Sequence, residues 1–218
     1  MHFTSRFSLG ISALALLLTV SSSAQADTLF SSLPSGNSGV GVTGPTSSPG
    51  FYTEVAGKFS PFETATLTSI LVPFYHNSGN NDALTFTLYD NVSNLPGASL
   101  ATFTLPAGSL AGFSSPNPLY SLNFGSILLT AGTSYWLGAA TTTTTYDVWL
   151  QNGTGLTVPT GIRNFPNSAF SLNGNVNVAF QVNGTPTAAA TPEPGTLTLL
   201  LGASLAMLGW RSVRRSAL

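Results

Sequence analysis

Apolar and polar residues alternate along much of this chain, and the alternation predicts β-strands. Apolar residues recur at every second position over residues 84–89 and again over 176–182. Each stretch predicts a strand with one buried face. Further strands are expected at 28–31, 55–59, 66–74, 99–105, 119–124, 127–129, 134–140, 146–151 and 169–172. Residues 27–190 show no helical period, so this segment is predicted to be all-β.

About ten short strands separated by turn residues are typical of a β-sandwich, and we favour a jelly-roll-like topology. Residues 33–50 are rich in Gly, Ser and Pro and are expected to form an irregular loop. In the strand over 66–74, Leu67 is out of phase with Ile70, Val72 and Phe74, which predicts a bulge. Pro73 favours an edge position for this strand, because proline lacks a backbone N–H.

The N-terminus has the three parts of a secretory signal peptide. Arg6 supplies the positive charge, residues 9–20 form an apolar stretch, and Ala24-Gln25-Ala26 is a small-x-small cleavage site. The signal peptide is therefore predicted over 1–26. Signal peptidase is the expected partner, and the mature chain begins near Asp27.

The C-terminus combines a proline pair, an apolar stretch and a basic end. Pro192, Glu193 and Pro194 separate the folded part from the apolar stretch, since proline stops both strands and helices. Residues 196–210 carry no charge and predict a transmembrane helix. Its fifteen residues span roughly 22 Å, less than a hydrocarbon core of about 30 Å. The three arginines at the end of the chain, Arg211, Arg214 and Arg215, are expected to stay cytoplasmic.

This tail over residues 191–218 resembles the PEP-CTERM sorting signal of Gram-negative bacteria. The resemblance implies recognition and cleavage by a membrane protease of the exosortase type. It also implies an inner-membrane-anchored precursor, followed by release to the cell surface or the extracellular matrix. An ordinary tail anchor is the alternative, in which the same helix stays permanently in the membrane.

Several short motifs between about residues 52 and 150 resemble the choice-of-anchor domains found ahead of surface-sorting tails. The resemblance implies an exported β-sandwich without an assigned biochemical activity. It is carried by Ala56-Gly57-Lys58-Phe59, Leu67-Thr68-Ser69-Ile70, Phe86-Thr87-Leu88-Tyr89-Asp90, Leu95-Pro96-Gly97 and the stretch over 129–137.

Residues 27–190 form one predicted domain with few charges and no cysteine. Lys58 and Arg163 are its only cationic residues, against six acidic ones. An acidic domain lacks the basic face that nucleic acid requires, so we expect no nucleic-acid partner. Without cysteine, the domain depends on its core or on a metal rather than on disulfides.

Candidates for catalysis are few. A Ser-His-Asp site would need His76, with Asp82 as the nearest carboxylate in sequence, but the chain has no Gly-x-Ser-x-Gly elbow. Residues 76–82 are more simply interpreted as a polar loop between two strands. Paired carboxylates for glycoside hydrolysis would come from a small set that is interpreted as surface charge: Glu54, Glu63, Asp82, Asp90 and Asp147. We predict no catalytic residue, metal or cofactor; the loop over 80–82 lacks the carboxylate density of a calcium site.

Trp149 is the strongest candidate for ligand binding. If Tyr146, Val148 and Leu150 face the core, then Trp149 lies on the opposite face beside Asp147 and Gln151. An exposed tryptophan between hydrogen-bonding side chains offers a platform for a sugar ring. Burial of Trp149 beneath a loop is the interpretation that we favour over an exposed platform, while Tyr135 and Trp136 are expected in the core.

The sequence thus predicts a non-enzymatic exported protein that is sorted to the cell envelope or to an exopolysaccharide matrix. The alternative function is a carbohydrate-binding module that uses Trp149, with exopolysaccharide as its partner. A secreted hydrolase that uses His76 or a carboxylate pair is a more distant third hypothesis.

Overall fold

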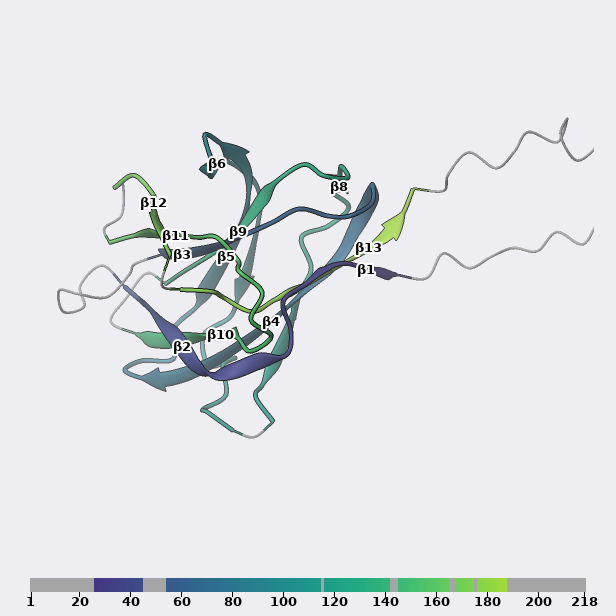
Figure 1. Ribbon diagram of the computed structural model, residues 1–218. Coiled ribbons are helices and arrows are strands. Elements are labelled where there is room, and N and C mark those ends of the chain that lie inside the picture. The colour runs from purple at the N-terminus through teal and green to yellow at the C-terminus, as the bar shows by residue number, and fades with distance from the viewer. Residues whose placement is uncertain are drawn as a thin grey trace, which may run out of the picture.

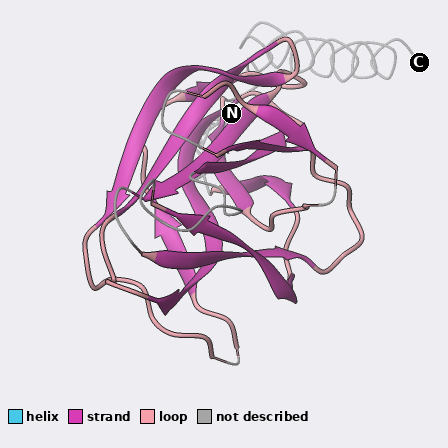
Figure 2. Ribbon diagram, turned by 90° about the vertical axis from the view of Figure 1, so that its left-hand side faces the viewer, coloured by secondary structure: helices cyan, strands magenta, loops and turns pink. Residues whose placement is uncertain are grey.

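The computed structural model describes residues 26–44, 54–114, 116–141, 145–164, 168–174 and 176–187, which form strands and loops (Figures 1 and 2). These residues contain thirteen strands, and the prediction of an all-β fold is confirmed for them. In chain order the strands are β1 (Asp27–Ser31), β2 (Ser35–Thr43), β3 (Glu54–Phe59), β4 (Ala65–Ser78), β5 (Leu84–Val92), β6 (Leu95–Leu105), β7 (Leu119–Leu122), β8 (Leu128–Leu129), β9 (Tyr135–Thr141), β10 (Tyr146–Asn152), β11 (Thr160–Arg163), β12 (Ser171–Asn173) and β13 (Gln181–Pro186).

Both predicted terminal helices, over the signal peptide and the sorting tail, lie outside the described residues. Within the described ranges, no helix has the length and apolar character needed to cross a membrane.

The strands pair into two antiparallel sheets. One sheet has the order β1-β13-β4-β10-β2, and β7 and β8 also pair with β4. The other has the order β12-β11-β3-β9-β5-β6. Figure 2 shows the strands of both sheets around a common interior.

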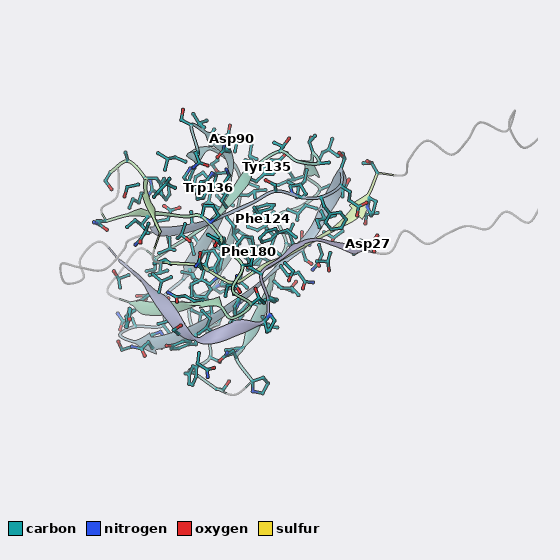
Figure 3. The ribbon with its side chains drawn as sticks, viewed as in Figure 1. Asp27, Asp90, Phe124, Tyr135, Trp136 and Phe180 are labelled. Atoms are coloured by element: carbon teal, nitrogen blue, oxygen red, sulfur yellow. The ribbon has the colours of Figure 1, made fainter. Side chains whose placement is uncertain are left out.

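Apolar side chains from both sheets fill that interior. Phe74 of β4 meets Phe86 of β5 edge to face, with the ring centroids 5.3 Å apart. Phe59 of β3 meets Phe180, just before β13, at 5.8 Å. Figure 3 places Phe180 and Phe124 in this interior. Large aromatic rings therefore join the two layers, as expected of a β-sandwich.

The period-two pattern identified the buried faces correctly. Leu84, Phe86 and Leu88 of β5 are fully buried in the core. The apolar residues of 176–182 are also buried, but regular strand begins only at Gln181. Residues 177–179 instead bond to β10, through Asn152 N to Asn177 O at 2.7 Å and Ala179 N to Leu150 O at 2.9 Å.

The expectation of an irregular loop over 33–50 is wrong for part of that segment. Residues 35–43 form β2, which pairs with β10. The glycines that suggested a loop are needed for this pairing, because their missing side chains leave room for β10. A Cβ at Gly39 would collide with Cγ1 of Val148, and one at Gly41 would collide with the ring of Tyr146.

The β4 strand contains the predicted bulge, but it is not an edge strand. Ser69 lies opposite Asn183 and Leu67 lies opposite Gly184, which leaves Thr68 as the extra residue. Both sides of β4 are paired, so the edge prediction from Pro73 is wrong. Along one side, the pairing with β13 ends at Leu71 and the pairing with β10 begins at Phe74. Pro73 thus lies where one partner strand replaces the other, a position that tolerates a missing N–H.

Candidate functional site

His76 and Asp147 form a hydrogen-bonded pair at one end of the sandwich. They are opposite residues of the neighbouring strands β4 and β10, and Nδ1 of His76 lies 2.9 Å from Oδ1 of Asp147. The side chain of Asp147 is fully buried, while that of His76 is 19% exposed. Two sequence interpretations are therefore corrected: His76 belongs to a strand rather than a loop, and its carboxylate partner is Asp147 rather than Asp82.

Burial raises the pKa of the Asp147 carboxyl, because desolvation disfavours its charged form. The hydrogen bond and charge of His76 lower the pKa of Asp147, and the nearby Asp82 raises it. A fully buried carboxylate orients the imidazole but cannot itself contact a substrate. A Ser-His-Asp site would also require a nucleophilic hydroxyl. The pair joins β4 to β10 by a side-chain hydrogen bond.

The loops around this pair are held by polar contacts of their own. The backbone N–H of His76 donates to Ala111 O at 2.8 Å, and Nδ2 of Asn81 donates to Leu110 O at 2.7 Å. The N–H of Asp82 donates to Oγ1 of the buried Thr145 at 3.4 Å. These bonds attach residues 110–111 to the end of β4 and to the loop after it.

A second polar cluster centres on Glu54 in the other sheet. Oη of Tyr89 donates to Oε1 of Glu54 at 2.7 Å, and Arg163 forms an ion pair with Oε2. The Arg163 guanidinium also lies 4.9 Å from the ring centroid of Phe170. Gly138 leaves space for this arrangement, since a Cβ there would lie 2.6 Å from Oε1 of Glu54.

The Glu54 cluster is an internally paired group that connects β3, β5 and β11. Burial raises the pKa of the Tyr89 hydroxyl, and the adjacent Glu54 raises it further. Sequence reasoning missed this cluster and assigned Glu54 and Asp147 to the surface. A buried charge needs a partner. Arg163 is one of only two cationic residues of the domain, and this scarcity was the one feature of the sequence that could have suggested a buried acidic partner such as Glu54.

Asp90, another of the candidate carboxylates, belongs to a turn. Its Oδ1 accepts a hydrogen bond from Ala98 N at 2.6 Å, next to the tight turn at Ser93 and Asn94. Both turn residues have positive φ, 51° and 64°, as a two-residue hairpin of type I′ requires. Asp90 therefore has a structural role in the β5–β6 hairpin. Glu63 is half-buried in the loop before β4.

The prediction that Trp149 faces outward is wrong, because its side chain is fully buried in the core between the sheets. Its ring packs on Phe74 at 5.2 Å, and Nε1 donates to Ala179 O at 2.8 Å. Val148 and Leu150, on the opposite face of β10, are buried too. Since both faces of β10 are covered, alternation in the sequence could not decide which face is the core.

The predicted sugar platform is therefore not present. Asp147 is buried with Trp149, and Gln151 accepts a hydrogen bond from Oγ of Ser38 at 3.3 Å. Tyr135 lies in the core as expected. Trp136 is fully buried outside the main core cluster, and its Nε1 donates to Oδ1 of Asn91 at 2.9 Å.

A groove of about 700 Å³ lies beside the end of β1 and the starts of β2, β7 and β13. Its lining includes the exposed side chains of Phe113 and Leu119. Sequence reasoning did not single out these residues, because Phe113 belongs to a loop and Leu119 to a short strand. Only the fold brings them together.

The predicted sorting residues Pro192, Glu193, Pro194, Arg211, Arg214 and Arg215 lie outside the described residues, as does Ala24 of the predicted cleavage site. Ala26 is described and exposed, directly before β1.

No family model, no curated protein and no solved structure matches this chain. A function must therefore be argued from the chain's own residues.

Proposed function

We propose that this chain is a non-enzymatic exported protein, sorted to the cell envelope or to an exopolysaccharide matrix by a PEP-CTERM/exosortase-type system. The observation that carries the proposal is the position of the two ends of the domain. Asp27, the expected first residue of the mature chain, begins β1 and lies opposite Gly184 of β13. Figure 1 shows these two strands side by side at one end of the domain.

This pairing constrains how the domain is delivered. Opposite residues in an antiparallel pair have Cα atoms about 4.5–5.5 Å apart. The proposed signal peptide and sorting tail would therefore be attached at the same end of the domain, although they belong to opposite ends of the chain. A domain tethered by either segment presents the same surface away from the membrane, before and after the signal peptide is removed.

The bounds of the first and last described strands agree with the proposed processing sites. The first strand begins at Asp27, directly after the predicted cleavage site, and the last strand ends at Pro186, before the proline pair at Pro192 and Pro194. Cleavage at both sites would leave every described strand intact. This agreement supports export followed by processing of the tail.

The polar interior supports a non-enzymatic role. Asp147 is fully buried and bonded to His76, and Glu54 is paired with Tyr89 and Arg163. Glu54 pairs with Arg163 of the neighbouring strand β11 and with Tyr89 on the far side of β9. Asp147 bonds to His76 of the neighbouring strand β4 through Oδ1, while its Oδ2 is buried without a hydrogen-bond partner. Such groups stabilise one fold by penalising alternative pairings of the strands, in which a buried charge would lose its partner.

The strand order supports the finer assignment to a jelly roll. Such a fold has two sheets of four strands, in which strands one, eight, three and six form one sheet and strands two, seven, four and five form the other. The rows β1-β13-β4-β7 and β3-β9-β5-β6 follow this order. The remaining strands, β2, β8, β10, β11 and β12, are added to these two sheets.

The test is localisation of a tail variant in a Gram-negative host that carries an exosortase. A protein with both Pro192→Ala and Pro194→Ala is expected to accumulate as an uncleaved inner-membrane precursor. Wild type and a Pro106→Ala control, at an exposed loop proline, should reach the cell surface or the medium. Identical distributions of variant and wild type would contradict sorting through this tail.

A further inference from the structure

The groove beside β1, β2, β7 and β13 combines apolar and neutral polar side chains. It is lined by Ser31, Leu33, Pro34, Ser35, Asn37, Phe113, Pro116, Asn117, Leu119 and Gln181. Its volume of about 700 Å³ lies within the usual range for small-ligand sites. These residues come from three separate stretches of the chain, 31–37, 113–119 and residue 181, so the surface exists only in the folded domain.

Phe113 gives the groove an exposed aromatic surface that is held in place. Its side chain is 56% exposed, and its ring lies edge-on to Tyr75 with the centroids 5.2 Å apart. Leu119 is 55% exposed and lies opposite Pro73 of β4. An exposed ring that is already positioned loses little conformational entropy when a ligand stacks on it.

Three amide side chains flank this apolar surface. Nδ2 of Asn117 donates to Oγ of Ser35 at 3.4 Å, and Oε1 of Gln181 accepts from Oγ of Ser31 at 3.4 Å. Asn37 is exposed on β2. Each amide offers two donors and two acceptor lone pairs, so the bond to Ser35 leaves Asn117 with capacity for a ligand. Nε2 of Gln181 also donates to Asn183 Oδ1 at 2.7 Å and to Thr28 Oγ1 at 3.3 Å, so Gln181 offers a ligand only an acceptor at Oε1. Donors and acceptors together match hydroxyl groups, which also act as both.

Among the described residues, the groove lining contains no ionisable side chain. Recognition of phosphate, sulfate or uronate groups depends on cationic side chains. The two cationic residues of the domain are engaged elsewhere: Arg163 pairs with Glu54, and Nζ of Lys58 donates to Oδ1 of Asn94 at 2.6 Å. The lining thus favours a neutral, hydroxyl-rich ligand over an acidic one.

We propose that this groove binds a short segment of a neutral polysaccharide, with a sugar ring on Phe113 and its hydroxyls bonded to Asn37, Asn117 and Gln181. A sugar ring has an apolar face and a polar edge, and the groove presents the same two chemistries side by side. This proposal assigns a ligand to the domain, and its evidence comes from the groove alone. Sorting through the tail can fail without affecting it.

Affinity electrophoresis of the full-length protein, purified in a mild detergent, tests the proposal. Separate native gels contain dextran, galactomannan, soluble β-1,3-glucan or alginate as the acidic control. Retardation by at least one neutral polymer, but not by alginate, is expected. Phe113→Ala should weaken that retardation about tenfold, as expected for loss of a stacked ring, and Asn117→Ala should weaken it as well.

Phe62→Ala is the matched control. Phe62 is also an exposed phenylalanine, 69% accessible, but it does not line the groove. Its removal should leave retardation unchanged, and all three variants should melt at the wild-type temperature. Because Phe113 and Asn117 are tested separately, failure of one variant to fold does not remove the test.

Three outcomes would overturn the proposal. They are no retardation by any of the three neutral polymers, retardation by alginate alone, and neutral-polymer binding that survives both groove substitutions. Light scattering adds a fourth: a wild-type dimer that Phe113→Ala converts to a monomer would assign the groove to a second copy of the chain.

Discussion

Asp27 and Gly184 lie opposite each other in the antiparallel pair of β1 and β13. Figure 3 shows Asp27 at the end of the domain where these strands meet. The residue expected to follow the signal-peptide cleavage site is thus part of a ladder with the last strand. The proposed signal peptide and sorting tail would therefore be attached to the same end of the domain.

Replacing Trp149 should strongly destabilise the domain. Its ring packs on Phe74, Phe86 and Phe180, and Nε1 bonds to Ala179 O. Trp149→Ala is expected to lower the free energy of unfolding by about 3–5 kcal/mol, measured by urea denaturation. Phe62→Ala, at an exposed position, should change it by less than about 0.5 kcal/mol. Equal stability of the two variants would contradict the buried position of Trp149.

Asp147→Asn should change how stability depends on pH. Burial raises the pKa of Asp147 in the folded chain above the ordinary value of about 3.9. The stability that this carboxyl contributes is fully present below the pKa that Asp147 has in the unfolded chain. It is lost as the pH rises through the raised pKa of the folded chain.

Asparagine carries no charge, so this loss is absent from the variant, and its side-chain oxygen still accepts a bond from His76. The free energy of unfolding of Asp147→Asn, minus that of wild type, is expected to increase as the pH rises above about 4. Urea denaturation across the acidic range measures this difference. A difference that decreases with pH would show that ionised Asp147 stabilises the fold.

Gly138→Ala should disrupt the Glu54 cluster. The new Cβ would lie 2.6 Å from Oε1 of Glu54 and 2.9 Å from Cε2 of Tyr89, so their hydrogen bond would have to move. We expect a loss of about 1–3 kcal/mol of stability. Ultraviolet titration should also show tyrosine ionisation at lower pH than in wild type, since burial and Glu54 together raise the pKa of Tyr89.

Gly112→Ala is the control for this variant, because nothing lies within 4 Å of the point that its new Cβ would occupy. Its stability and tyrosine titration should match those of wild type. If Gly138→Ala also matches wild type in both measurements, the packing around Glu54 is looser than described.

The sequence was sufficient to predict a strand and its buried face where only one face of the strand is buried. In β5, for example, the alternation identifies Leu84, Phe86 and Leu88 as the buried residues. It failed where both faces are covered, because buried residues then occur on both sides, as in β10 around Trp149. It also failed where glycine serves strand packing rather than a turn, as at Gly39 and Gly41. Composition alone does not distinguish these two uses of glycine.

The polar clusters and the groove depended on pairing between distant segments. His76 and Asp147 come together only because β4 lies beside β10, and Phe113 reaches the groove through a loop that bonds to the end of β4. In sequence, Asp82 was the nearest carboxylate to His76, and Trp149 was the most prominent aromatic candidate. Proximity along the chain therefore gave the wrong partner for His76, and residue type alone gave the wrong aromatic side chain for the groove.

Sorting by cleavage is tested most directly by the intact mass of the protein recovered from the cell surface or medium of a Gram-negative host with an exosortase. We predict a chain that begins at Asp27 and lacks the apolar segment over residues 197–210. In a strain without the exosortase, the same protein should retain that segment. A surface-exposed protein that still carries residues 197–210 in the exosortase-positive host would contradict sorting by cleavage and favour a permanent tail anchor.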